Sequence, residues 1–70
     1  SNSEIGWDIM DGMGRALLQQ FLDAGTITNV SPETDFAVDR TRSRGDSTYF
    51  NVSVQPVDSA EKLYFTVETR

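Results

Sequence analysis

Residues 47–67 show the clearest alternation of apolar and polar side chains along the chain. A period of two places successive side chains on opposite faces of a β-sheet. The apolar positions of the two halves are Phe50, Val52, Val54, Leu63, Phe65 and Val67. Pro56 and Ser59 lie between the halves and favour a turn, since proline cannot donate a hydrogen bond to a neighbouring strand. The pattern predicts an antiparallel hairpin with one apolar and one polar face.

Residues 8–24 have the three- and four-residue spacing of an amphipathic helix. Its apolar stripe consists of Met10, Met13, Leu17, Phe21 and Ala24, and its polar side of Asp8, Asp11, Gly12, Arg15, Gln19 and Asp23. We expect Ser3 or Asp8 to cap the first turn and Gly25 to end the helix. Each of the two glycines inside this range costs about 1 kcal/mol relative to alanine. Either the first turn is weak, which we favour, or another backbone approaches closely there.

The segment between the helix and the hairpin is predicted to contain only short elements of secondary structure. Residues 26–34 form a connector that can begin extended at Ile27, and Pro32 prevents a helix from continuing through it. Phe36 and Val38 then alternate with polar or small neighbours, which predicts a short strand.

The predicted order of elements is therefore helix, strand, strand, strand, in one domain that spans residues 1–70. We predict an α+β fold in which one amphipathic helix packs on a small, mainly antiparallel three-stranded sheet. The residues expected to be buried between these two layers are Leu17, Phe21, Phe50, Val52 and Phe65. Because the chain starts without methionine, we expect a processed product or a fragment of a larger protein.

The absence of cysteine and histidine excludes several classes of functional site. No disulfide or thiolate ligand is possible, and neither are histidine-dependent catalytic triads or the usual zinc sites. The net charge of -5 disfavours a nucleic acid or an anionic membrane as the main partner. No apolar run approaches the roughly 20 residues that a bilayer-spanning helix needs.

Charged side chains cluster in two places that could contact a partner. Arg40, Arg42 and Arg44 lie in the loop between the short strand and the hairpin, where they could meet an acidic partner or a phosphate. The simpler interpretation, which we favour, is a solvated loop. Asp8 and Asp11 lie on the polar side of the helix, where we expect them to face water near a favourable helix N-terminus. Since no nucleophile, base and oxyanion donor can be assembled, we expect no enzyme, no cofactor and no metal site.

The order and spacing of these residues also resemble a known family. The helix ends in LLQQFLDAGTI (residues 17–27), and the later strands carry Phe36-Ala37-Val38-Asp39, Gln55-Pro56-Val57 and Ser59-Ala60-Glu61. This pattern is similar to the C-terminal, tube-proximal domain of contractile tail sheath proteins from phages and related injection machines. The matching residues are Phe36, Val38, Gly45, Val52, Val54, Pro56, Ala60, Glu61 and Phe65. Lys62 departs from the pattern, since the family more often has an aromatic or aliphatic residue there.

The resemblance implies a structural role in the contractile tail of a virion, assembled in the host cytoplasm. Many copies would stack in rings around a tail tube, and strands added to each other's sheets would link them. The intersubunit strand would comprise Leu63, Tyr64, Phe65, Thr66 and Val67. The candidate tube contacts are Asp8, Asp11, Arg15, Asp23, Arg40, Arg42 and Arg44. The alternatives are a baseplate-wedge component, whose family is also similar, and a stand-alone domain that binds an acidic protein through the arginine loop.

Overall fold

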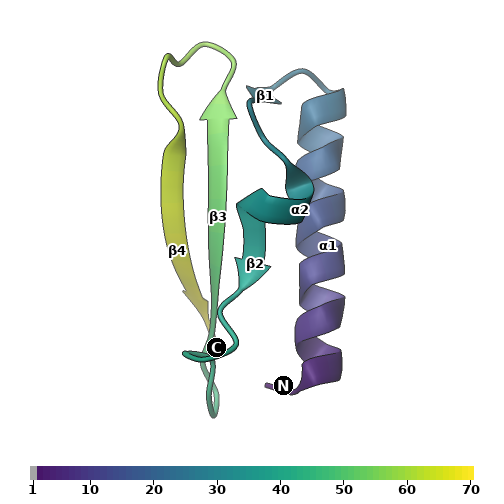
Figure 1. Cartoon of the computed structure of the whole chain (residues 1–70), viewed down its shortest axis with the longest axis vertical. Coiled ribbons are helices and arrows are strands. Elements are labelled where there is room, and N and C mark those ends of the chain that lie inside the picture. Colours follow the sequence, from purple (N-terminus) through teal and green to yellow (C-terminus); the bar gives the residue numbers. More distant parts are fainter. Residues whose placement is uncertain (1) are drawn as a thin grey trace.

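The computed structural model describes residues 2–70, and Figure 1 displays its elements along the chain. They are α1 (Glu4–Asp23), β1 (Ile27–Thr28), α2 (Pro32–Asp35), β2 (Phe36–Val38), β3 (Thr48–Pro56) and β4 (Leu63–Thr69). The predicted α+β fold is confirmed, because one long helix accompanies a small antiparallel sheet. The sheet has one strand more than predicted, since the extended start at Ile27 pairs with β3 as β1.

Strand β3 is the centre of the sheet. The predicted hairpin is confirmed, because β4 pairs antiparallel with β3 along one side, with Val52 opposite Phe65. Strands β2 and β1 share the other side of β3, where Phe36 lies opposite Val52 and Ile27 opposite Pro56. One nine-residue strand thus pairs with all three others, whereas its alternation predicted only the pairing with β4.

Helix α1 begins four residues before the predicted start and ends where predicted. Ser3 is the N-cap, and its Oγ accepts the backbone N–H of Gly6 at 3.1 Å. Gly25 has a φ of 74°, and its N–H donates to the Leu22 carbonyl at 3.0 Å. The next N–H, that of Thr26, reaches back to the Phe21 carbonyl, which completes the usual glycine-terminated helix end.

Helix α2 was not predicted, because Pro32 was interpreted only as a helix stop. Proline is also well tolerated in the first turn of a helix, where its missing N–H would have no partner anyway. The Asp35 carboxylate accepts the Ser31 N–H at 2.8 Å and the Lys62 ammonium at 2.9 Å. Lys62 also donates to the Asn29 carbonyl at 2.8 Å. This lysine therefore ties the connector and α2 to the hairpin.

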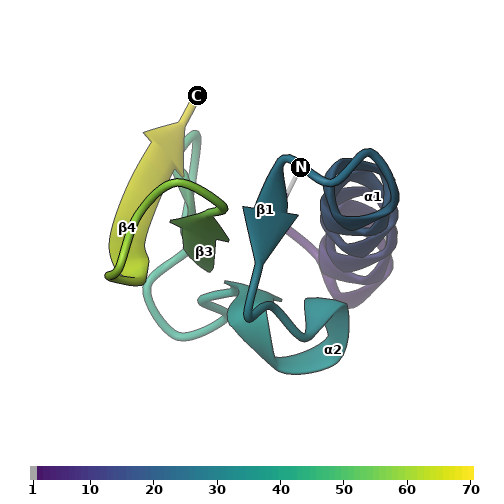
Figure 2. The same cartoon turned by 90° about the horizontal axis from the view of Figure 1, so that it is seen from above.

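Helix α1 and the apolar face of the sheet do not pack against each other as predicted. Helix α1 lies against β2, α2 and β1, and it makes no close backbone contact with β3 or β4 (Figure 2). The buried apolar side chains are Leu18, Phe36 and Val38. Among the residues predicted to be buried, Leu17, Phe21 and Phe65 are exposed, while Phe50 and Val52 are half-buried. The prediction was wrong because periodicity identifies a shared face without identifying what covers it.

At Gly14, a side chain of β2 lies against the backbone of α1. A Cβ at this position would lie 2.2 Å from Cζ of Phe36, whereas a Cβ at Gly12 would meet nothing within 4 Å. Helix α1 is continuous from Glu4 through both glycines, and Gly14 is approached by a side chain rather than by another backbone. Gly14 admits the Phe36 ring, which also lies 5.1 Å from the ring of Phe50.

Candidate functional site

An open apolar trough runs between α1 and the sheet. One wall is formed by α1 and the other mainly by β3, with Ile27 of β1, Phe36 of β2 and Phe65 of β4 beside it. Its volume is about 1160 Å³. The side chains that define the trough are Ile9, Met13, Leu17 and Phe21 from α1, Val52 and Val54 from β3, and Phe65 from β4. We refer to this surface below as the apolar trough.

The α1 wall of the trough includes Met13, Leu17 and Phe21 of the predicted apolar stripe, and an exposed row of apolar side chains extends it toward the start of the helix. Ile5, Ile9, Met13, Leu17 and Phe21 follow one another at four-residue spacing, and all five are exposed. The most exposed of these, Ile5 and Met13, show 74% and 69% of their surface to solvent. Monomeric proteins rarely leave so continuous an apolar surface uncovered, and such surfaces mark contacts with another chain segment or protein.

The chemistry of the trough is uniform. None of the residues that line it is charged, and the only polar side chains among them are those of Gln20 and Thr26. Such a surface offers no group for acid–base or nucleophilic chemistry. What it can do is bury an apolar partner, which the hydrophobic effect favours in proportion to the area removed from water.

The charged groups form a separate cluster around Arg40, on the side of α1 away from the trough. The guanidinium contacts the carboxylates of Glu4 at 2.6 Å, Asp8 at 2.7 Å and Asp11 at 2.9 Å. It also lies 5.8 Å from the centroid of the Trp7 ring. Glu4 and Asp8 are largely exposed, so water screens their part of the cluster. The cluster joins the first three turns of α1 to the end of β2.

Asp11 is the buried member of this cluster. Its Oδ1 accepts the backbone N–H of Val38 at 2.8 Å, and its Oδ2 accepts from Arg40. Burial raises the pKa of the Asp11 carboxyl, but the hydrogen bonds from Val38 and Arg40 and the charges of Arg15 and Arg40 outweigh it and hold the pKa below 3.8. The expectation that Asp8 and Asp11 both face water holds for Asp8 and is wrong for Asp11.

Arg15 lies one turn further along the same side of α1. Its Nη2 donates to the Phe36 carbonyl at 3.4 Å, and its Nε is buried without a partner among the described residues. Asp11, Gly14 and Arg15 therefore face β2 together, which is the arrangement that three- and four-residue spacing allows on a helix. Of the candidate tube contacts on α1, only Asp8 and Asp23 have exposed side chains.

The three arginines of the loop do not present one surface. Arg40 points into the acidic cluster, whereas the guanidinium of Arg42 lies 4.0 Å from the centroid of the Tyr49 ring. Arg44 is exposed and donates from Nε to the Thr41 carbonyl at 3.3 Å. The loop itself is more ordered than the predicted solvated loop, because the Ser43 hydroxyl is buried and accepts the Tyr49 N–H at 2.9 Å.

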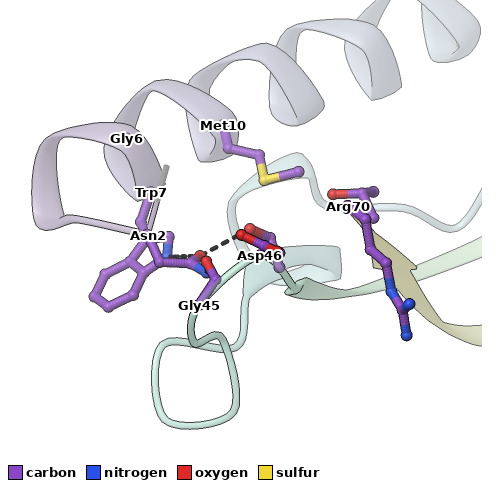
Figure 3. Close-up of a pocket in the computed structure, with 9 residues that line it drawn as sticks. Asn2, Gly6, Trp7, Met10, Gly45, Asp46 and Arg70 are labelled. Atoms are coloured by element: carbon purple, nitrogen blue, oxygen red, sulfur yellow. Dashed lines mark hydrogen bonds between the residues drawn. The ribbon is translucent and has the colours of Figure 1, made fainter.

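A smaller pocket of about 580 Å³ lies where the start of α1 meets the loop (Figure 3). Asn2 spans it, donating to the carbonyls of Gly45 at 3.0 Å and Ser47 at 2.8 Å. Its Oδ1 accepts from Trp7 Nε1 at 3.0 Å and from the Thr48 hydroxyl at 2.7 Å. All four bonds of the Asn2 amide are used within the domain, so this pocket joins structural elements rather than offering a binding site.

Strand β4 contains the five residues proposed for the intersubunit strand. Leu63, Tyr64, Phe65 and Thr66 are exposed and Val67 is half-buried. The Thr66 hydroxyl donates to Asn51 Oδ1 across the hairpin at 2.7 Å. The strand pairs with β3 of its own chain, and no other strand within residues 2–70 pairs with its opposite edge.

Residues 2–70 contain neither a cluster of metal-ligating side chains nor a helix suited to span a membrane. In this part of the chain, no group of three or more metal-ligating side chains lies close enough together to hold an ion. Over the same residues, no helix combines the length and the apolar character that crossing a membrane requires.

Comparisons with known proteins give a consistent result. A family model described as "Phage tail sheath C-terminal domain" matches residues 1–70. The phage-like element PBSX protein XkdK of Bacillus subtilis (strain 168) is 36% identical over 66 residues, which are 94% of this chain and 14% of that protein.

Two solved structures are similar to the domain over its full length or nearly so. The sheath tail protein of Desulfitobacterium hafniense superposes with a TM-score of 0.89 at 28% identity, over 100% of this chain and 16% of that one. The sheath tail protein Lin1278 of Listeria innocua has a TM-score of 0.80 at 36% identity, over 96% of this chain and 15% of that one. The chain thus spans about one seventh of the length of these relatives.

Proposed function

Since the chain belongs to the phage tail sheath C-terminal domain family, we propose that it is the tube-proximal assembly domain of a contractile tail sheath. Its role is structural: copies of the parent protein associate with one another around a tail tube, in the tail of a virion. The observation that carries the proposal is the match of the family model to residues 1–70, together with two sheath tail proteins of the same fold.

The apolar trough supports this role. A stand-alone binding domain would leave Ile9, Met13 and Leu17 in water, at a continuous cost in free energy. In a sheath protein of the length of the relatives, most of the polypeptide lies outside the matched part. We assign the trough to an apolar segment of that same polypeptide, which would dock the domain on the rest of the subunit.

Links between subunits would use strand addition. A free strand edge presents unpaired N–H and C=O groups, and an extended segment of a neighbouring subunit can satisfy them while its side chains fit beside the existing ones. Such a link keeps its backbone hydrogen bonds while the bodies it joins move as rigid units. That property suits a sheath whose rings rotate and shorten.

Contact with the tube would use the charges that the domain has not already paired. Asp8, Asp11, Arg15 and Arg40 are held in internal contacts, which leaves Asp23 on the helix and Arg42 and Arg44 on the loop. We favour Asp23, whose carboxylate forms one hydrogen bond within residues 2–70, from Gln19 on the same helix at 2.9 Å. Charge complementarity of this kind sets register and weakens with salt.

A chimera tests the proposed function. The matching segment of the Listeria innocua sheath tail protein would be replaced by residues 1–70, and the chimera would be produced with the tail tube protein of the same phage element. Electron microscopy should show sheathed tubes, as with the unaltered protein. A chimera that folds but forms no sheath in any condition would refute the proposal.

The tube contact is tested on that chimera with a matched pair of charge reversals. Asp23→Lys should reduce the sheathed fraction of tubes most strongly at low salt. Asp58→Lys, in the exposed turn between β3 and β4, is the control and should assemble normally. Equal assembly by both variants would remove Asp23 from the tube contact.

A further inference from the structure

Within residues 2–70, the apolar trough offers few hydrogen-bonding groups to anything that docks in it. The polar side chains that line it in this part of the chain are those of Gln20 and Thr26, and the Thr26 hydroxyl already donates to the Phe21 carbonyl at 3.1 Å. The backbone of β3, which forms much of one wall, is paired with β4 on one side and with β2 and β1 on the other. A segment that docks here must therefore satisfy its own backbone groups.

This requirement favours a helix over an extended segment. An α-helix pairs its N–H and C=O groups internally, whereas those of a strand stay unpaired unless another strand lies beside it. On β2, the Val38 N–H is bound by Asp11 and the Phe36 carbonyl by Arg15, so neither is available to an added segment. An extended occupant would bury unpaired backbone groups against apolar side chains, which costs free energy.

The α1 wall has the form that a second helix packs against. The exposed side chains from Ile5 to Phe21 follow one another at four-residue spacing. Residues four apart form the ridges that interdigitate when two helices pack. This ridge is about 24 Å long, since an α-helix rises 1.5 Å per residue. An amphipathic helix of about 16–18 residues would cover it.

The two walls of the trough stand apart at their backbones. No Cα atom of α1 lies within 8 Å of one in β3 or β4 (Figure 2). Packed helices lie about 8–10 Å from their neighbours. A helix laid along the open side can therefore contact Met13 and Leu17 of α1 and, at the same time, Val54 and Phe65 of the sheet.

The position of α1 indicates which part of a longer polypeptide reaches the trough first. The matching family is that of the C-terminal domain, and the chain spans about one seventh of the length of its relatives. In a parent of that length, most residues precede the domain. Helix α1 begins at Glu4, and Gly6 already lines the trough. A chain that leads into α1 therefore arrives at one end of the trough.

We propose that the apolar trough holds an amphipathic helix of the same polypeptide, from the residues that precede α1. This assignment rests on the proposed sheath function, which supplies the longer parent, and it names the secondary structure of the docked segment and its place in the chain. The apolar side of this helix covers Met13, Leu17 and Phe65, and its polar side remains in water. Docking completes the core between α1 and the sheet that the apolar stripe of α1 predicted.

Cysteine labelling of the unassembled sheath chimera tests whether its own chain covers the trough. Residues 1–70 contain no cysteine, and any cysteine elsewhere in the chimera would be replaced by serine. Leu17→Cys places a thiol in the trough, whereas Gln19→Cys, on an exposed part of the same helix outside the trough, is the matched control. A maleimide reagent should label Leu17→Cys at least tenfold more slowly than Gln19→Cys. Equal rates would overturn the proposal, and protection of Leu17→Cys that appears only in assembled sheaths would overturn it in favour of a neighbouring subunit.

A cysteine scan of the roughly 20 residues that precede the domain in the chimera tests the secondary structure of the occupant. Slow labelling at every third or fourth position is expected, because that is the spacing of one face of a helix. Slow labelling at every second position, or at none, would overturn the helix. Neither measurement requires a sheath to form, so such a result leaves the sheath function standing. A chimera that labels as expected and forms no sheath would count against the sheath function and not against the docked helix.

Discussion

Removing the Asp11 carboxylate tests whether the contact between α1 and β2 depends on one buried group. Asp11→Ala leaves the buried Val38 N–H without an acceptor. An unpaired buried donor costs about 1–3 kcal/mol. The Arg40 guanidinium still contacts the carboxylates of Glu4 and Asp8, so losing its contact with Asp11 lowers stability only slightly. A domain of this size has about 4–10 kcal/mol of stability in total, so this single change removes a large share.

The assay is urea unfolding of the 70-residue chain followed by far-ultraviolet circular dichroism. With a denaturant slope of about 1 kcal/mol per molar urea, the midpoint should fall by about 1–3 M. Asp11→Asn keeps an oxygen acceptor for the Val38 N–H, so its urea midpoint should fall less than that of Asp11→Ala. Asp8→Asn removes an exposed carboxylate from the same arginine and should have the smallest effect, because water screens that pair. Equal midpoints for Asp11→Ala and Asp8→Asn would refute the reasoning.

The same carboxylate should make stability depend on pH. Because the pKa of Asp11 is lower in the folded chain than in the unfolded chain, its contribution is complete above roughly pH 5 and is lost as the pH falls through the lowered value. Asp11→Asn should therefore unfold with a weaker pH dependence between roughly pH 5 and pH 2. Parallel pH profiles for the variant and the unsubstituted chain would show that other carboxylates dominate.

Three further substitutions separate the packed part of the domain from its open surface. Gly14→Ala should lower stability by about 1–2 kcal/mol, since displacing the Phe36 ring outweighs the gain in helix propensity; a raised melting temperature would contradict this. Phe50→Ala should cost about 2–3 kcal/mol by thermal unfolding, less than a fully buried phenylalanine. Leu17→Gln should leave the melting temperature of the isolated chain nearly unchanged but prevent sheath assembly of the chimera, and normal assembly would exclude the α1 wall from docking.

Local features of the fold followed directly from the residues. Strict alternation predicted β3 and β4, and Gly25 predicted the end of α1, because both depend on neighbouring residues only. The resemblance to tail sheath proteins, carried by residue order from Leu17 to Phe65, is confirmed by the family match. The start of α1 was misplaced although the Ser3 cap was considered, and α2 was missed although Ser31 and Pro32 are a recognised helix start.

The burial of each face could be decided only by the tertiary structure. The sequence determined that Met13, Leu17 and Phe21 share one side of α1, and it could not determine that this side remains open. Asp11 lies on the side that looked solvated, and it is buried because Val38 and Arg40, 27 and 29 residues further along the chain, supply its hydrogen bonds. Helical periodicity follows from local geometry, whereas the choice of the packed side follows from partners that are distant in sequence.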